Sequence, residues 1–220
     1  MNKEKIYKYV KEKYKEYGEH INDVSDLWTS YMFPVIKTAL EFGKEHPGIN
    51  LTVVEYASLL HNIASLEDFF KKNNMDLQGR NEICAKRAAD LITDELPKEM
   101  VLKVMDCIRD YGKEFERAEI YDENRCLTDA IAVVNFEKMY ELLSWRKQIS
   151  NKHTNAIKSE IDKLTESYFS MSASIKELYQ KRYEEYISIL NAKLSAINEE
   201  LLGSIVSGYT GIVMQEGGCN

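Results

Sequence analysis

Apolar residues recur every three or four positions along most of this chain, the spacing that places them on one face of an α-helix. The first such segment, residues 3–17, is otherwise strongly charged. Its apolar stripe consists of Ile6, Tyr9, Val10, Tyr14 and Tyr17. No segment alternates apolar and polar residues at every second position, as a half-buried strand would. The pattern predicts an all-α protein, a single helical bundle with long C-terminal helices.

Glycine, proline and polar residues divide this pattern into separate helices. Gly18 is expected to end the first helix, and the second is expected to begin after Asp23 or Ser25. Pro34 lies inside the second helix, where it is expected to kink the helix or to displace its first turn. The remaining predicted helices span 52–65, 80–93, 98–111, 121–147, 154–169 and 172–202, with a polar loop over 71–79.

The length and composition suit one globular domain with a real hydrophobic core. The chain has 220 residues, of which 44% are hydrophobic and 30% are charged. We expect a helical domain over residues 1–202. Residues 203–220 contain five glycines and no lysine or arginine, so we expect a flexible Gly-rich tail there.

Charge and cysteine content narrow the functional class. The net charge of −7 disfavours broad contact with nucleic acid or with an anionic membrane. No apolar run is long enough to cross a bilayer, and the charged first 15 residues do not resemble a signal peptide. Cys84, Cys107 and Cys126 fall on apolar stripes and no CxxC pair is present, which favours buried thiols over disulfides or zinc ligands. These features predict a cytoplasmic protein.

The segment 53–64 (VVEYASLLHNIA) is the most informative for chemistry. An apolar helix here presents His61 and then Asn62 at positions expected to be buried. A single histidine on an apolar face is more often a hydrogen-bonded core residue than a ligand, yet imidazole also binds metals. Both interpretations stay open. The chain has no Gly-rich phosphate loop, no GxSxG turn and no HExxH motif.

Several segments, taken in their order and spacing, resemble the HD-domain superfamily of metal-dependent phosphohydrolases. They are 26–31 (DLWTSY), 59–65 (LLHNIAS), 84–89 (CAKRAA), 107–111 (CIRDY) and 126–132 (CLTDAIA). The resemblance covers about residues 3–190. It is closest to the small, single-domain bacterial and archaeal members of the superfamily.

The resemblance implies a metal site built from a His on the second helix, a His-Asp pair on the third and an Asp on a later helix, with two auxiliary His positions. On this chain the four principal positions fall on Tyr31, His61, Asn62 and Asp129, and the auxiliary positions near Arg80 or Asn81 and on Tyr111. Only His61 and Asp129 keep the ligand identity.

The altered positions imply that a divalent cation would be weakly held. A carboxamide offers only a neutral carbonyl oxygen, and tyrosine phenols, with pKa values near ~10, are poor ligands at neutral pH. We therefore expect no bound metal or other cofactor, with a divalent metal required only if the protein is active. In this interpretation His61 donates a hydrogen bond to Asp129, while Tyr31, Asn62 and Tyr111 occupy the space of the lost metal.

The function predicted in this way is that of an HD-like protein that is non-catalytic or weakly active and binds a small phosphorylated ligand or a protein partner. Arg80, Arg109 or Arg125 could contact phosphate through forked hydrogen bonds. One alternative is an active phosphohydrolase for a nucleotide or phosphate monoester, with a site rebuilt around Asp68 or Asp110. Another is a helical interaction module with a filled pocket, whose tyrosine-rich terminal helices form a homodimer.

Overall fold

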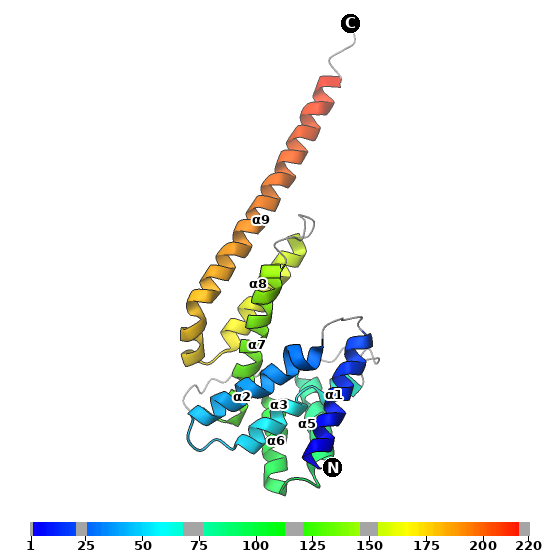
Figure 1. The fold of residues 1–220 in the computed structure, drawn as a ribbon. Helices are drawn as coiled ribbons and strands as arrows, with labels where there is room; N and C mark the ends of the chain where they lie inside the picture. Colours follow the sequence, from blue (N-terminus) through cyan, green and yellow to red (C-terminus); the bar gives the residue numbers. More distant parts are fainter. Residues whose placement is uncertain (1, 21–25, 68–76, 113–120, 146–153, 216–220) are drawn as a thin grey trace.

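The computed structural model describes residues 2–20, 26–67, 77–112, 121–145 and 154–215. Every regular element in these ranges is helical, so the all-α prediction is confirmed (Figure 1). The helices are α1 (Lys3–His20), the π-helix η1 (Trp28–Met32), α2 (Phe33–Glu45), α3 (Leu51–Leu60), α4 (Ile63–Glu67), α5 (Leu77–Ile92), α6 (Lys98–Asp110), α7 (Glu123–Trp145), α8 (Thr154–Ser170) and α9 (Ala173–Gln215).

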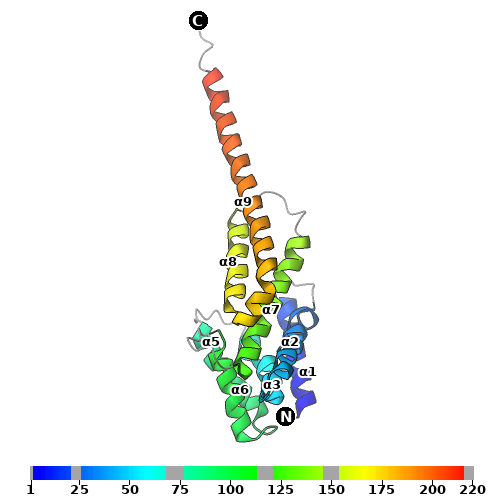
Figure 2. The same ribbon diagram turned by 90° about the vertical axis from the view of Figure 1, so that its left-hand side faces the viewer.

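The helices pack into two regions that share α7. Helices α1 to α6 gather around the first part of α7, while the rest of α7 packs beside α8 and α9 (Figures 1 and 2). The larger core contains Leu127 and Ile131 of α7, and the smaller one contains Phe136 of the same helix. Phe136 is fully buried and contacts the rings of Tyr179 and Tyr186 on α9. Helix α7 therefore fixes the position of each region relative to the other.

Helix α1 lies against α3 and α4 through one apolar stripe and through polar contacts at its edge. Its buried residues are Ile6, Val10, Tyr14 and Gly18, which recur every fourth position. At the edge of the stripe, Tyr7 donates a hydrogen bond of 2.6 Å to Glu55 of α3. Gly18 is buried within α1, so the prediction that it ends the helix is wrong. These contacts hold the Tyr14 side chain on the inner side of the molecule.

The expected effect of Pro34 is found in the structure. The segment before it forms the π-helix η1, and α2 then begins at Phe33 with proline in its first turn. Proline has no backbone N–H to donate, and its ring would clash with the carbonyl of Ser30 in a continuous α-helix. The wider turn of the π-helix η1 directly precedes α2, and it places the Tyr31 side chain toward the interior.

The helix predicted over 52–65 is divided in two. Asn50 caps its start by accepting hydrogen bonds from the backbone N–H groups of Thr52 and Val53. Helix α3 ends at Leu60, His61 and Asn62 form a turn, and α4 begins at Ile63. The two residues of greatest chemical interest therefore lie on a turn between helices.

Two further boundaries differ from the prediction. Helix α5 begins at Leu77, inside the expected loop over 71–79. Helix α9 continues to Gln215 instead of ending at Leu202, so the expected tail begins as helix; residues 216–220 lie outside the described ranges. Glycine disfavours a helix interior by about 1 kcal/mol, but adding a residue to an existing helix costs far less than starting one. No helix in the described ranges has both the length and the apolar composition needed to cross a bilayer.

Candidate functional site

His61 is buried, with 2% of its surface exposed, and both of its ring nitrogens have partners. Nδ1 lies 2.8 Å from the carbonyl oxygen of Ser58, and Nε2 lies 2.8 Å from the amide nitrogen of Asn62. Because a carbonyl can only accept, Nδ1 carries the proton and Nε2 accepts from Asn62. His61 is thus a neutral imidazole, and the predicted hydrogen bond from His61 to Asp129 is wrong.

Asp129 is fully buried and has a different set of partners. Oδ1 accepts a hydrogen bond of 2.7 Å from the backbone N–H of Ser172, and Oδ2 accepts one of 3.1 Å from the hydroxyl of Tyr121. The Nε atom of Arg125 lies 3.6 Å from Oδ1. Because Ser172 lies between α8 and α9, this carboxylate fastens α7 to the start of α9.

Three of the predicted site residues, Tyr31, Asn62 and Arg80, line one cavity of about 460 Å³, which we call the tyrosine cavity. Its lining also includes residues that the sequence did not single out for function: Tyr14, Tyr17, Ser65, Asn135 and Lys138. The side chains come from α1, η1, the turn before α4, α4 itself, α5 and α7. The space beside the altered ligand positions is therefore open, in contrast to the filled pocket that one alternative requires.

The tyrosine cavity has a positive lining in a protein whose net charge is −7. Arg80 and Lys138 contribute two positive charges, and none of the described residues that line the cavity is acidic. The Lys138 ammonium lies 5.5 Å from the centre of the Tyr31 ring, a cation–π distance. Such a lining attracts anions and repels metal cations.

The tyrosines of this cavity are hydrogen-bond donors at neutral pH. Burial raises the pKa of Tyr31 and of Tyr14 well above the ordinary value, so both hydroxyls stay protonated. The Tyr14 hydroxyl is buried, and it has no hydrogen-bond partner among the described residues. Asn62 is near enough to lower the Tyr14 pKa, but their geometry is not that of a hydrogen bond. An unpaired buried hydroxyl costs about 1–3 kcal/mol, which a bound acceptor would recover.

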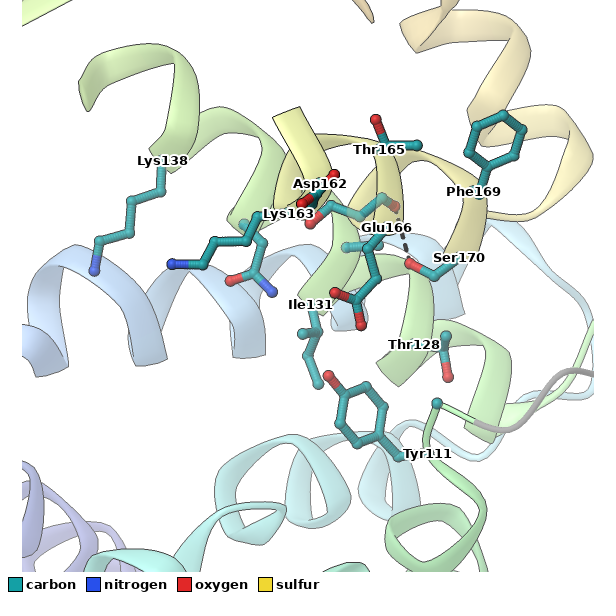
Figure 3. Close-up of a pocket in the computed structure, with 14 residues that line it drawn as sticks. Tyr111, Thr128, Ile131, Lys138, Asp162, Lys163, Thr165, Glu166, Phe169 and Ser170 are labelled. Atoms are coloured by element: carbon teal, nitrogen blue, oxygen red, sulfur yellow. Dashed lines mark hydrogen bonds between the residues drawn. The ribbon is translucent and has the colours of Figure 1, made fainter. Parts of the chain in front are cut away.

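Tyr111 and Asn81 belong to an adjoining space. Tyr111 lines a second cavity of about 810 Å³ between the end of α6, α7 and α8, which we call the polar groove (Figure 3). The Asn81 side chain donates a hydrogen bond of 2.7 Å to the Tyr111 carbonyl, and the Tyr111 ring meets the His61 ring edge-on at 6.0 Å. Asn81 therefore positions Tyr111 and lies outside the lining of both cavities.

Tyr111 also connects the two spaces electrostatically. Burial raises its pKa to about 12, the Glu166 carboxylate adds to the increase, and the Arg80 guanidinium opposes it. Arg80 lines the tyrosine cavity and Glu166 lines the polar groove. The Tyr111 phenol is therefore a protonated donor at neutral pH, and its pKa depends on charges in the tyrosine cavity and in the polar groove.

The other candidate residues are placed elsewhere. Arg109 pairs with Glu82 at 2.6 Å, and Arg125 lies beside Asp129, so neither lines the tyrosine cavity. Asp68 lies outside the described residues. Within the described ranges, no group of three or more His, Cys, Asp and Glu side chains is arranged to hold a metal ion.

Comparisons of the chain with protein-family models, with curated proteins and with solved structures found no significant match.

The environment of His61 predicts a loss of stability in acid. Burial lowers the pKa of His61 to about 4, although the hydrogen bond to Ser58 opposes part of this shift. The unfolded chain, with a histidine pKa of about 6.5, takes up the proton first as the pH falls. Stability should therefore fall between about pH 6.5 and pH 4, with a loss of about 2 kcal/mol from this residue between pH 7 and pH 5.

Urea unfolding of the wild type and of His61→Gln at both pH values measures this contribution. The variant keeps a side-chain donor for Ser58 but does not titrate, so its loss should be smaller by that amount. Equal losses in the two proteins would contradict the buried neutral imidazole.

Asp129→Ala should lower the free energy of unfolding by about 3 kcal/mol, because it leaves the Ser172 N–H and the Tyr121 hydroxyl without their acceptor and removes the carboxylate beside Arg125. Asp106→Ala is the matched control, since Asp106 is an exposed partner of Arg109 and its removal should cost less than about 1 kcal/mol. Both variants are compared by urea unfolding with EDTA and with manganese. A deficit of Asp129→Ala that appears only with manganese would indicate a metal ligand instead.

Proposed function

We propose that this protein is an HD-like phosphohydrolase relative with an altered site, and that it binds a small phosphorylated ligand in the tyrosine cavity without hydrolysing it efficiently. The observation that supports this most directly is the lining of the cavity. Two cationic side chains and several hydroxyl and amide groups converge there, and no described lining residue is acidic.

The groups in the tyrosine cavity match the chemistry of a phosphate. Arg80 and Lys138 supply charge-assisted donors, which are the strongest hydrogen bonds available to an oxyanion. Tyr14 and Tyr31 add neutral donors held in the protonated form by burial. A phosphate oxygen placed near Tyr14 would satisfy its buried hydroxyl, which lacks a partner among the described residues.

The same groups are poorly suited to metal-assisted hydrolysis. Divalent cations in such sites require carboxylate oxygens or free imidazole nitrogens, and a metal must hold a water before it can activate it. His61 has both nitrogens engaged, and Asp129 faces Ser172 and Tyr121. These contacts support binding over catalysis.

Lys138→Met should weaken the binding of inorganic pyrophosphate by about tenfold to a hundredfold, because it removes a charged donor while keeping the length of the side chain. Isothermal titration calorimetry at low ionic strength measures the change. Lys181→Met is the control, since Lys181 is exposed on α9 outside the cavity, and it should leave the affinity unchanged. Equal effects of the two changes would reduce the interaction to nonspecific charge attraction and contradict the proposed site.

Tyr14→Phe separates a binding role from a structural one. The free protein should be as stable as the wild type or up to about 1 kcal/mol more stable, because the lost hydroxyl has no partner. Pyrophosphate binding should weaken about fivefold to tenfold. Tyr7→Phe should behave in the opposite way, since its hydroxyl pairs with Glu55 away from the cavity: less stable, with unchanged affinity. A stability loss in Tyr14→Phe with no change in affinity would contradict the proposal.

Two measurements on the same protein distinguish the alternative functions, an active phosphohydrolase and an interaction module. Metal-stimulated phosphate release from a nucleotide or monoester, abolished by His61→Ala, would favour an active phosphohydrolase with a rebuilt site. Absence of binding to any phosphate compound, together with a dimeric mass by light scattering, would favour the interaction module.

A further inference from the structure

The polar groove has two lysines on one side and a glutamate on the other, and Asp162 also lines it. Figure 3 shows Lys138 and Lys163 extending toward one side, while Glu166 and Tyr111 point toward each other on the other side. Among the residues that the structure describes, neither Lys163 nor Glu166 has a partner for an ion pair. Their charges are therefore available to a bound molecule.

The cationic end of the groove is continuous with the tyrosine cavity. Asn135 and Lys138 line both spaces, so the two meet at one face of α7. Volumes of about 460 and 810 Å³ fall within the range of small-molecule sites. One extended ligand can therefore place a charged group beside Lys138 and its remaining atoms in the groove.

The far end of the groove is rich in hydrogen-bond acceptors. The Thr128 hydroxyl donates its proton to Asn124, and the Ser170 hydroxyl donates its proton to the carbonyl of Ser167, so each keeps lone pairs for a ligand. Glu166 adds two carboxylate oxygens. Ile131 and Phe169 supply apolar surface alongside. Acceptors grouped in this way complement a molecule with several O–H donors.

Building on the proposed phosphate site, we infer that the polar groove binds the hydroxylated organic part of the same ligand, so that the preferred ligand is the phosphate ester of a polyol. The phosphate lies in the tyrosine cavity with Lys138 at the junction, and the hydroxyl groups extend toward Glu166. No bond is made or broken in this step, and the second space adds specificity to the first.

Calorimetry on the full chain with three probes tests this arrangement. The probes are inorganic phosphate, n-butyl phosphate, which adds an alkyl group, and ribose 5-phosphate, which adds a hydroxylated group. The two esters have a similar charge, but only ribose 5-phosphate carries hydroxyl groups. Ribose 5-phosphate should bind at least about tenfold more tightly than n-butyl phosphate, because its hydroxyl groups can donate hydrogen bonds to the charged Glu166 carboxylate.

Glu166→Ala should remove most of this preference and leave the affinity for inorganic phosphate unchanged. Glu166 is exposed, so the variant should fold normally, which its thermal melting curve checks. Glu177→Ala is the matched control, since Glu177 is an exposed carboxylate on α9 outside both cavities, and it should keep the preference.

The possible failures are distinguishable. If phosphate and both esters bind equally well, or if Glu166→Ala keeps the preference for ribose 5-phosphate, the assignment of the groove is overturned while the phosphate site stands. If none of the three probes binds, both the proposed phosphate site and the assignment of the groove are contradicted.

Discussion

The burial of α7 in two cores is the constraint on which the rest of the structure depends. Its first turns pack among α1 to α6, and Phe136 then packs against α9. Because α7 is one rigid helix that packs in both cores, the face of α7 that is not packed in either core has a fixed position between the two regions. Asn135 and Lys138 occupy that face, which is why they line two adjoining spaces. Rigid placement of this kind is what a site for a small molecule requires.

A single exchange of residue type changes the electrostatics of such a site. A carboxylate at position 62 would add a negative charge beside His61 and favour a cation. Asn62 instead donates a hydrogen bond to the imidazole, and burial keeps His61 neutral by lowering its pKa, so the charges left at the cavity are those of Arg80 and Lys138. The result is a cavity with a positive lining, in which Tyr31, Asn62 and Arg80 stand at or near positions where the HD-domain resemblance implies metal ligands and Lys138 does not.

The sequence predicted the helices well because their apolar spacing reflects burial, which is a property of each helix. It also predicted that His61 is buried and that Tyr31, Asn62 and Arg80 belong together. It failed for the His61–Asp129 contact because periodicity defines a buried face without defining which residue lies opposite. The sequence marks Tyr14 only as part of an apolar stripe, and its motifs do not single out Lys138. The shared face of Asn135 and Lys138, three residues apart, was the available signal for the latter.

The 43 residues of α9 span about 65 Å at the usual rise per residue, and most of that length lies beyond the ends of α7 and α8 (Figures 1 and 2). Its base is tied down at Ser172 by the buried Asp129 carboxylate. Helix α9 packs in the smaller core as far as Leu190, so a tilt of about 10° at that point would displace the tip, about 38 Å further along, by about 6.5 Å. A change in the angle at which α9 leaves the smaller core would therefore have its largest effect at Gln215.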